Sequence, residues 1–509
     1  MSTIRKQSII SSLVIYFGFA VGLLNTYFFT REAIPGFASF TDEQYGLTSI
    51  FVAVAGMMMA FASLGMPTYV IKFYPYYYDH LPPRKNDMMT WALLVSIAGF
   101  VLVMLTGFVI KPIVVRKFTA NSPLLVHYYY WIFILGFGLT IYTVLEVCAW
   151  NVGKSVLTNF LREVQWRLLT TLIIVLFITH VIKDFDLFIK LYAFTYPGIA
   201  LTLFIYLLAT KKIHLAFSVS KVTRRYLTKI FRLCSFVYFG TVVSTLSQVF
   251  DTIVIASVLD DGTAKAGIFG LAQIMGSVIQ APQRGITSAS IGHLSRAWKE
   301  KNMTLLKRVY QRSSINMLIF ACCLFALIAL NYKEAIIAFQ LKDTFLLGFN
   351  AFILIGFIRL IDMGTGVNAQ IILTSTYWKF ELFCGIILLI IMLPLTIILT
   401  RSYDIMGPAI ATLVSVSIYN GLRILFLWKK FGLFPFTIQT VYTLLLTGAC
   451  FAICYSLFSG IHGFPGLIIR SLVFCITFGT GVIYLQLTPD IKPVLQTISK
   501  RLKLNGKNN

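Results

Sequence analysis

Residues 45–71 read YGLTSIFVAVAGMMMAFASLGMPTYVI, a stretch that contains no Asp, Glu, Lys or Arg. A helix needs about 20 apolar residues to cross the hydrocarbon core of a bilayer, which is about 30 Å thick. The stretch is long enough, and the charged residues Asp42, Glu43 and Lys72 stand just outside it. It therefore predicts a transmembrane helix with well-marked ends.

Comparable apolar stretches follow one another along the whole chain. Hydrophobic residues make up 58% of the sequence and charged residues only 12%, whereas soluble domains carry about 25% charged residues. A chain of this composition has too little polar surface to face water, so we expect an all-α integral membrane protein with about fourteen transmembrane helices. The expected spans are 8–29, 45–71, 88–111, 124–148, 165–182, 187–209, 231–257, 266–291, 313–331, 345–374, 380–399, 405–428, 437–458 and 464–487.

The basic residues predict the topology. The chain has 43 Lys and Arg against 19 Asp and Glu, a formal net charge of +24. Most of the bases fall in alternate loops, above all 212–231 and 292–312, while Glu32 and Asp260 lie in loops of the other set. Basic loops face the cytoplasm, so both termini are predicted to be cytoplasmic. Topology and anionic lipid head groups account for the charge without a nucleic-acid partner.

The loops 212–231 and 292–312 also place apolar side chains among their bases at near-helical spacing, for example Tyr226 and Ile230 in the first. This pattern predicts amphipathic helices that lie in the membrane interface. No loop is long enough to form a soluble domain.

Three short motifs recur in the same order in the two halves of the chain. They are YFG at 16–18 and 238–240, YGL and FGL at 45–47 and 269–271, and PGIA and PAIA at 197–200 and 408–411. An even number of helices separates the copies, so the sequence predicts two pseudo-symmetric six-helix bundles of the same orientation. The expected parts are a bundle at 1–210, a basic cytoplasmic linker at 211–232, a second bundle at 233–430, and a helix pair with a basic tail at 431–509.

Polar side chains inside the spans need an explanation, because a charge near the bilayer centre costs about 2.5 to 3.5 kcal/mol. Arg284 shares one face of its helix with Gln273 and Gln280, and this polar face is longer than a single ion pair requires. It favours the lining of a cavity. The other cavity candidates are Asn25, Gln248, Arg359 and Gln370, and the candidate ion-coupling carboxylates are Asp251 and Asp362.

Ion pairing is an alternative explanation for these charges. Arg359 and Asp362 are three residues apart on one helix and could neutralise each other, and Arg284 could pair with Asp251 on the preceding helix. Glu146, at the cytoplasmic end of its span, is expected to reach the membrane surface by snorkelling.

The sequence contains no phosphate-binding loop, no His-Glu-x-x-His, no Cys-x-x-Cys and no nucleophile elbow. All eight cysteines lie in or beside apolar stretches, where small buried side chains are the expected role. We therefore expect no enzyme, no metal site and no cofactor. Energy for transport would come from a gradient, with H⁺ or Na⁺ as the coupling ion.

The stretches TDEQYGL at 41–47, SLGMP at 63–67 and IKFYP at 71–75 resemble the polysaccharide transporter branch of the multidrug, oligosaccharidyl-lipid and polysaccharide flippase superfamily. This resemblance implies a V-shaped pair of six-helix bundles whose cavity opens alternately to each side of a bacterial inner membrane. The implied cargo is an undecaprenyl-pyrophosphate-linked oligosaccharide, moved from the cytoplasmic to the periplasmic leaflet for polysaccharide synthesis, such as that of lipopolysaccharide O-antigen. Glycosyltransferases and a glycan polymerase are the implied partners.

A pyrophosphate and sugar head group requires a cationic, hydrogen-bonding cavity, whereas the polyprenyl tail can stay in lipid. Arg284 and Arg359 are therefore our candidate pyrophosphate contacts. Two alternatives remain. A multidrug exporter of the same superfamily would favour an acidic cavity and usually twelve helices. A membrane-bound glycan polymerase or ligase generally carries a large periplasmic loop, which this sequence lacks.

Overall fold

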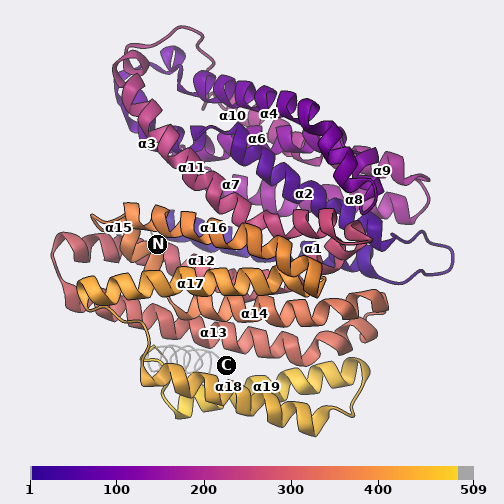
Figure 1. Cartoon of the computed structure of the whole chain (residues 1–509). Coiled ribbons are helices and arrows are strands. Elements are labelled where there is room, and N and C mark those ends of the chain that lie inside the picture. The colour runs from indigo at the N-terminus through magenta and orange to yellow at the C-terminus, as the bar shows by residue number, and fades with distance from the viewer. Residues whose placement is uncertain (1–2, 491–509) are drawn as a thin grey trace, which may run out of the picture. The chain divides into compact units, whose positions relative to one another are not determined.

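The computed structural model describes residues 3–490, and over this range the chain is helical with no β-strand (Figure 1). The first elements are α1 (Thr3–Thr30), α2 (Asp42–Ala62), α3 (Met66–His80), η1 (Pro83–Lys85), α4 (Met88–Phe118), α5 (Pro123–His127), α6 (Trp131–Asn151), α7 (Ser155–Asn159), η2 (Phe160–Gln165), α8 (Trp166–Ile178), α9 (Phe185–Ala193), α10 (Thr195–Ala209) and α11 (Lys221–Val258). They are followed by α12 (Gly262–Lys299), α13 (Met303–Ala338), η3 (Asp343–Gly348), α14 (Phe349–Gly364), α15 (Asn368–Thr374), α16 (Lys379–Tyr403), α17 (Met406–Phe431), α18 (Ile438–Phe458) and α19 (Gly463–Tyr484).

The helices group into two compact units. Unit 1 is Met1–Gly270 with Thr400–Asp404, and unit 2 is Leu271–Leu399 with Ile405–Asn509. The division falls inside α12, and α11 belongs to unit 1. The boundaries that the repeat predicts, 1–210, 211–232, 233–430 and 431–509, describe sequence similarity and not contacts, so they stay a prediction.

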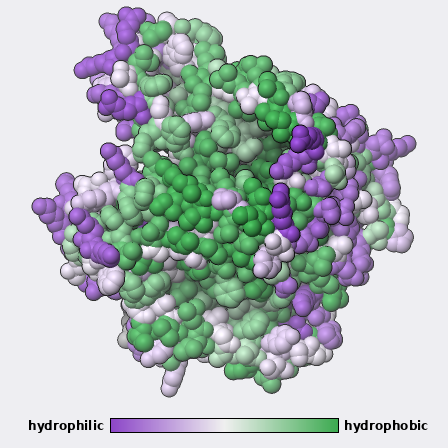
Figure 2. All heavy atoms as spheres, in the orientation of Figure 1, coloured by the Kyte–Doolittle hydropathy of each residue, from purple (hydrophilic) through white to green (hydrophobic). Residues whose placement is uncertain are grey.

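Twelve helices between residues 3 and 490 are long and apolar enough to cross a membrane. Together with the helical architecture, they confirm a multi-pass membrane protein. The two remaining expected spans, 165–182 and 266–291, are helical as well, in α8 and α12. Gln273, Gln280 and Gln283 make α12 more polar. On the face that Figure 2 shows, hydrophobic side chains cover the middle of the helices and hydrophilic ones gather at the helix ends.

The prediction of separate interfacial helices at 212–231 and 292–312 is wrong. Lys221 begins α11, which continues without a break to Val258, and the second region is divided between the end of α12 and the start of α13. The physical reason is that the apolar side chains of these regions pack on protein. The Tyr226 ring lies 5.9 Å from that of Phe73 and 5.1 Å from that of Tyr76, both on α3.

Two expected spans are broken into a long and a short helix. The span 45–71 is interrupted at Leu64 and Gly65, which have φ of 47° and 77°, and continues as α3. The span 345–374 is interrupted at Gly366, with φ of 67°, and continues as α15. Glycine suits these left-handed positions. A Cβ on Gly65 would also lie 2.6 Å from the Cys234 carbonyl oxygen, so the break lets α11 approach closely.

In unit 2, α18 and α19 pack on α13. Leu318, Cys322, Cys454 and Phe474 belong to their common core. Polar contacts fasten both ends of this assembly. At one end Glu334 of α13 lies 3.3 Å from His462 and 3.6 Å from Arg470, and at the other Arg312 Nε donates to Asp490 Oδ2 at 2.7 Å. The final helix pair is therefore an integral part of unit 2.

Gly46→Ala is expected to lower the melting temperature of the purified protein in detergent. Its added Cβ would lie 1.7 Å from the Thr263 carbonyl oxygen, so α2 and the start of α12 would have to separate. Overpacking of this kind costs about 1 to 3 kcal/mol. Gly56→Ala in the same helix is the matched control, because its Cβ would meet open space. Equal melting temperatures for Gly46→Ala and the parent would contradict this close contact.

Candidate functional site

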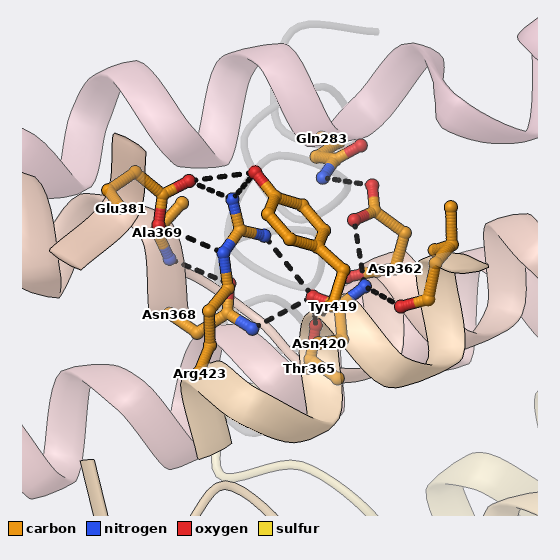
Figure 3. Close-up of polar contacts among 10 residues, drawn as sticks. Gln283, Asp362, Thr365, Asn368, Ala369, Glu381, Tyr419, Asn420 and Arg423 are labelled. Atoms are coloured by element: carbon orange, nitrogen blue, oxygen red, sulfur yellow. Dashed lines mark hydrogen bonds and ion pairs between the residues drawn. The ribbon is translucent and has the colours of Figure 1, made fainter. Parts of the chain in front are cut away.

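A network of buried and half-buried polar side chains links α12, α14, α16 and α17 in unit 2, together with α15 (Figure 3). Its centre is on α17, where Arg423 lies three residues after Asn420 and four after Tyr419, so that it is near both side chains. Asn420 and Arg423 are 1% and 5% exposed. A buried polar group costs free energy unless it has a hydrogen-bond partner. The network supplies such partners to the polar residues of this otherwise apolar helix.

An ion pair between α16 and α17 forms one end of the network. Arg423 Nε donates to Glu381 Oε2 at 3.0 Å, and Arg423 Nη2 contacts Glu381 Oε1, which makes the pair bidentate. The Tyr419 hydroxyl donates to the same carboxylate at 2.9 Å, and the guanidinium carbon lies 3.7 Å from the centre of the Tyr419 ring. Such a planar, stacked arrangement is specific to arginine.

Asn420 connects this ion pair to α14 and α15. Its Oδ1 accepts hydrogen bonds from Arg423 Nη1 at 3.3 Å, Asn368 Nδ2 at 3.0 Å and Thr365 Oγ1 at 3.2 Å. Its Nδ2 donates to Asp362 Oδ1 at 3.5 Å. The break after α14 makes this possible, because it turns both Thr365 and Asn368 toward α17.

Asp362 forms the other end of the network. Gln280 Nε2 and Gln283 Nε2, both on α12, donate to Asp362 Oδ2 at 3.3 and 3.1 Å. Gln283 Oε1 is buried without a hydrogen-bond partner in the described part of the chain. The amides of Gln280, Gln283 and Asn420 all turn their N–H donors toward Asp362, so they satisfy the charge of this carboxylate. No group of three His, Cys, Asp or Glu residues with metal-binding geometry occurs within the described range.

The structure brings some of the predicted site residues of unit 2 together. Gln280 and Asp362 are in contact, and a Cβ on Gly276 of α12 would lie 3.9 Å from Arg359 Nε, so Arg359 faces the same helix. Gln273 and Gln370 are half-buried on α12 and α15. The backbone of Arg284 lies in α12, but its side chain is outside the described part of the structure.

The predicted residues of unit 1 have separate environments. Asn25 is buried, donates to the Arg167 carbonyl oxygen at 2.9 Å and accepts from Thr171 Oγ1 at 2.6 Å, so it fastens α1 to α8. On α11, Gln248 is exposed and donates to Ser244 Oγ at 3.3 Å. Asp251 lies one turn further along α11 and is 5% exposed.

The sequence analysis missed a charged cluster around η2, a π-helical turn. Glu146 is 2% exposed and pairs with Arg162 at 3.1 Å, so the expectation that it snorkels to the surface is wrong. Glu163 pairs with Arg167 at 2.9 Å. A Cβ on Gly22 of α1 would lie 3.0 Å from Arg167 Nε, so small residues on α1 make room for this cluster.

Comparisons with known proteins identify the fold. No protein-family profile matches the chain, and no curated protein matches its sequence. The lipid II flippase MurJ, in an inward closed conformation, matches with a TM-score of 0.71 at 15% identity, covering 94% of this chain and 99% of that one. An inward-facing multidrug resistance MATE family transporter of the MOP superfamily gives 0.66 at 12%, covering 83% and 98%. A MOP superfamily transporter from Pyrococcus furiosus gives 0.54 at 13%, covering 84% and 96%. The chain thus has the fold of these transporters.

Proposed function

We propose that this protein is a flippase that moves a polyprenyl-pyrophosphate-linked oligosaccharide across a bacterial inner membrane by alternating access. The observation that carries the proposal is the polar network of unit 2, in which Asp362 accepts hydrogen bonds from three amide side chains. Arg359 lies one turn before Asp362 on the same helix, α14. Such groups are costly in a membrane and mark sites for polar cargo or ions. The fold shared with a lipid II flippase supports the same class of cargo.

A multidrug exporter is the second candidate, because a MATE transporter also shares the fold. The share of the chain that each structure matches favours the flippase. MurJ matches 94% of the chain, and the MATE transporter matches 83%. The two candidates differ in their cargo. Loss of surface polysaccharide on deletion, with unchanged drug sensitivity, is the result expected of a glycan flippase. Increased sensitivity to cationic drugs, with the polysaccharide intact, would favour the exporter.

In this proposal the arginines Arg284 and Arg359 of unit 2 contact the pyrophosphate, and Gln273, Gln280 and Gln370 of the same unit bind the head group. Gln248 and Asn25 of unit 1 are further candidate contacts of the cargo. H⁺ or Na⁺ couples transport to a gradient, and of the two candidate carboxylates we take Asp251 as the ion carrier and Asp362 as its static counterpart. The cargo is moved from the cytoplasmic to the periplasmic leaflet. Glycosyltransferases build it before transport, and a polymerase uses it afterwards. No cofactor is needed.

Arg284→Ala is expected to abolish export of the glycan while the protein still inserts into the membrane. Arg284→Lys is expected to restore part of the export, because a point charge attracts phosphate without the bidentate geometry. Surface glycan in a deletion strain measures export, and a tagged protein measures insertion. Arg224→Ala, at an exposed position of α11, is the matched control for loss of a positive charge. Full export by Arg284→Ala would remove this residue from the site.

The proposed topology places both termini and the basic ends of α11, α12 and α13 in the cytoplasm. In a background with Cys475→Ala, because Cys475 is exposed, we expect an impermeant thiol reagent to label Asp260→Cys on intact cells. The same reagent should reach Ser218→Cys, an exposed position before α11, only after the cells are opened. Labelling of Ser218→Cys on intact cells would contradict the proposed topology and indicate the opposite orientation.

A further inference from the structure

A groove of about 460 Å³ lies on unit 1 where the turn between α6 and α7 meets α1 and α10. Apolar side chains form most of its wall, namely Val14, Val156, Leu157 and Phe160, and Gly153, Lys154 and Tyr206 complete it. Gly153 has φ of 73°, and a Cβ there would meet open space. The groove is therefore open to the surroundings of the protein beside this turn.

Lys154 supplies the charge of the groove. Its Nζ lies 5.9 Å from the centre of the Tyr206 ring, and no acidic side chain in the described range pairs with it. Trp150, 44% exposed in the last turn of α6, is held by a 2.9 Å hydrogen bond from its Nε1 to Thr158 Oγ1. An exposed Trp and a half-buried Tyr beside a lysine are typical of the level of the lipid head groups.

We propose that this groove binds an anionic phospholipid, with its phosphate on Lys154 and an acyl chain along Val14, Leu157 and Phe160. A cation at the head-group level next to an apolar wall matches the two ends of such a lipid. The proposed topology puts this turn in the cytoplasmic leaflet, where anionic lipids are abundant. A single lysine matches one phosphodiester, whereas a pyrophosphate cargo would require several donors. The site is thus distinct from the proposed transport site.

The full chain, purified in detergent and titrated with 1-palmitoyl-2-oleoyl phosphatidylglycerol, tests the proposal by native mass spectrometry. Lys154→Gln is expected to weaken retention of this lipid about fivefold, the equivalent of one lysine near an anionic surface. Lys154→Arg is expected to retain it. Lys211→Gln, at an exposed lysine that follows α10, is the matched control and is expected to bind as the parent does.

Two further measurements distinguish the groove from charge alone. Val14→Trp should fill the groove and reduce retention of phosphatidylglycerol while Lys154 is still present. Phosphatidylcholine of the same chains should be retained equally by the parent and by Lys154→Gln, and glycerol 3-phosphate should not displace the lipid. Equal phosphatidylglycerol retention by the parent, Lys154→Gln and Val14→Trp would overturn the proposal, and so would displacement by glycerol 3-phosphate. The readout is binding, so it is independent of the transport function.

Discussion

Glu381→Gln is expected to destabilise the protein by about 3 to 5 kcal/mol, because it leaves the Arg423 guanidinium buried without its counter-charge. Arg423 is 5% exposed and donates to both carboxylate oxygens of Glu381. Domains are stable by only about 5 to 15 kcal/mol, so the loss would be a large part of the total. We expect a sharply lower melting temperature in detergent and less protein in the membrane fraction.

Two controls separate this effect from loss of a surface charge. The double variant Glu381→Met with Arg423→Met is expected to recover most of the stability, because removal of both charges leaves no unpaired ion. Glu300→Gln breaks the exposed pair of Arg296 and Glu300 and is expected to leave melting unchanged. A parental melting temperature for Glu381→Gln would show that the pair does not stabilise the fold.

Asp251→Asn is expected to abolish the response of transport to an ion gradient while cargo binding stays intact. Asp251 is a buried carboxylate within the apolar helix α11, and its protonation or cation occupancy would change what its neighbours can pair with. Coupling free energies are typically 1 to 3 kcal/mol, so gradient-driven accumulation in proteoliposomes should fall at least about fivefold. A parental response to both H⁺ and Na⁺ gradients would make Asp251 a structural residue.

Asp362→Asn is the informative comparison for Asp251→Asn. Asp362 is held by Gln280, Gln283 and Asn420, so we expect it to act as a fixed partner of the network. Its replacement should weaken both binding and stability, since three amides would lose a charged acceptor. A variant that binds cargo normally and loses only the gradient response would instead assign the coupling role to Asp362.

The sequence predicts the helices well because length and apolarity alone determine a membrane span. It does not predict where the spans break. At the break at Gly366, a Cβ would lie 2.9 Å from the Ser314 backbone nitrogen. Glycine is therefore required there by a contact between distant parts of the chain, which the local sequence does not reveal. At the starts of α11 and α13 the apolar residues recur with the period of a helix, as the sequence predicts. The sequence could not tell whether this apolar face contacts lipid or protein.

The candidate site was partly predictable. Asp362 and Gln280 stand out as polar residues within apolar spans, and the structure brings them into contact. Glu381 and Arg423 were missed, since each lies near the end of its span, where a charge usually snorkels to the surface. Their pairing joins residues 42 positions apart in sequence. The available signal was the face of α17 that carries Asn420 and Arg423 together.

The π-helical turn at Phe160–Gln165 makes the helix tolerant of a shorter chain at this point. A π-helical turn bonds each residue to the fifth one along, so it accommodates one residue more than an α-helical turn. Deleting one residue from this segment would therefore restore an α-helical turn and leave Arg167 beside Gly22 on α1. Each α-helical residue rotates the chain by about 100°, so deleting one residue inside α8 would instead rotate the rest of that helix. Among homologues, a one-residue gap at Phe160–Gln165 would signal an α-helical turn, whereas a gap inside α8 would signal a changed helix face.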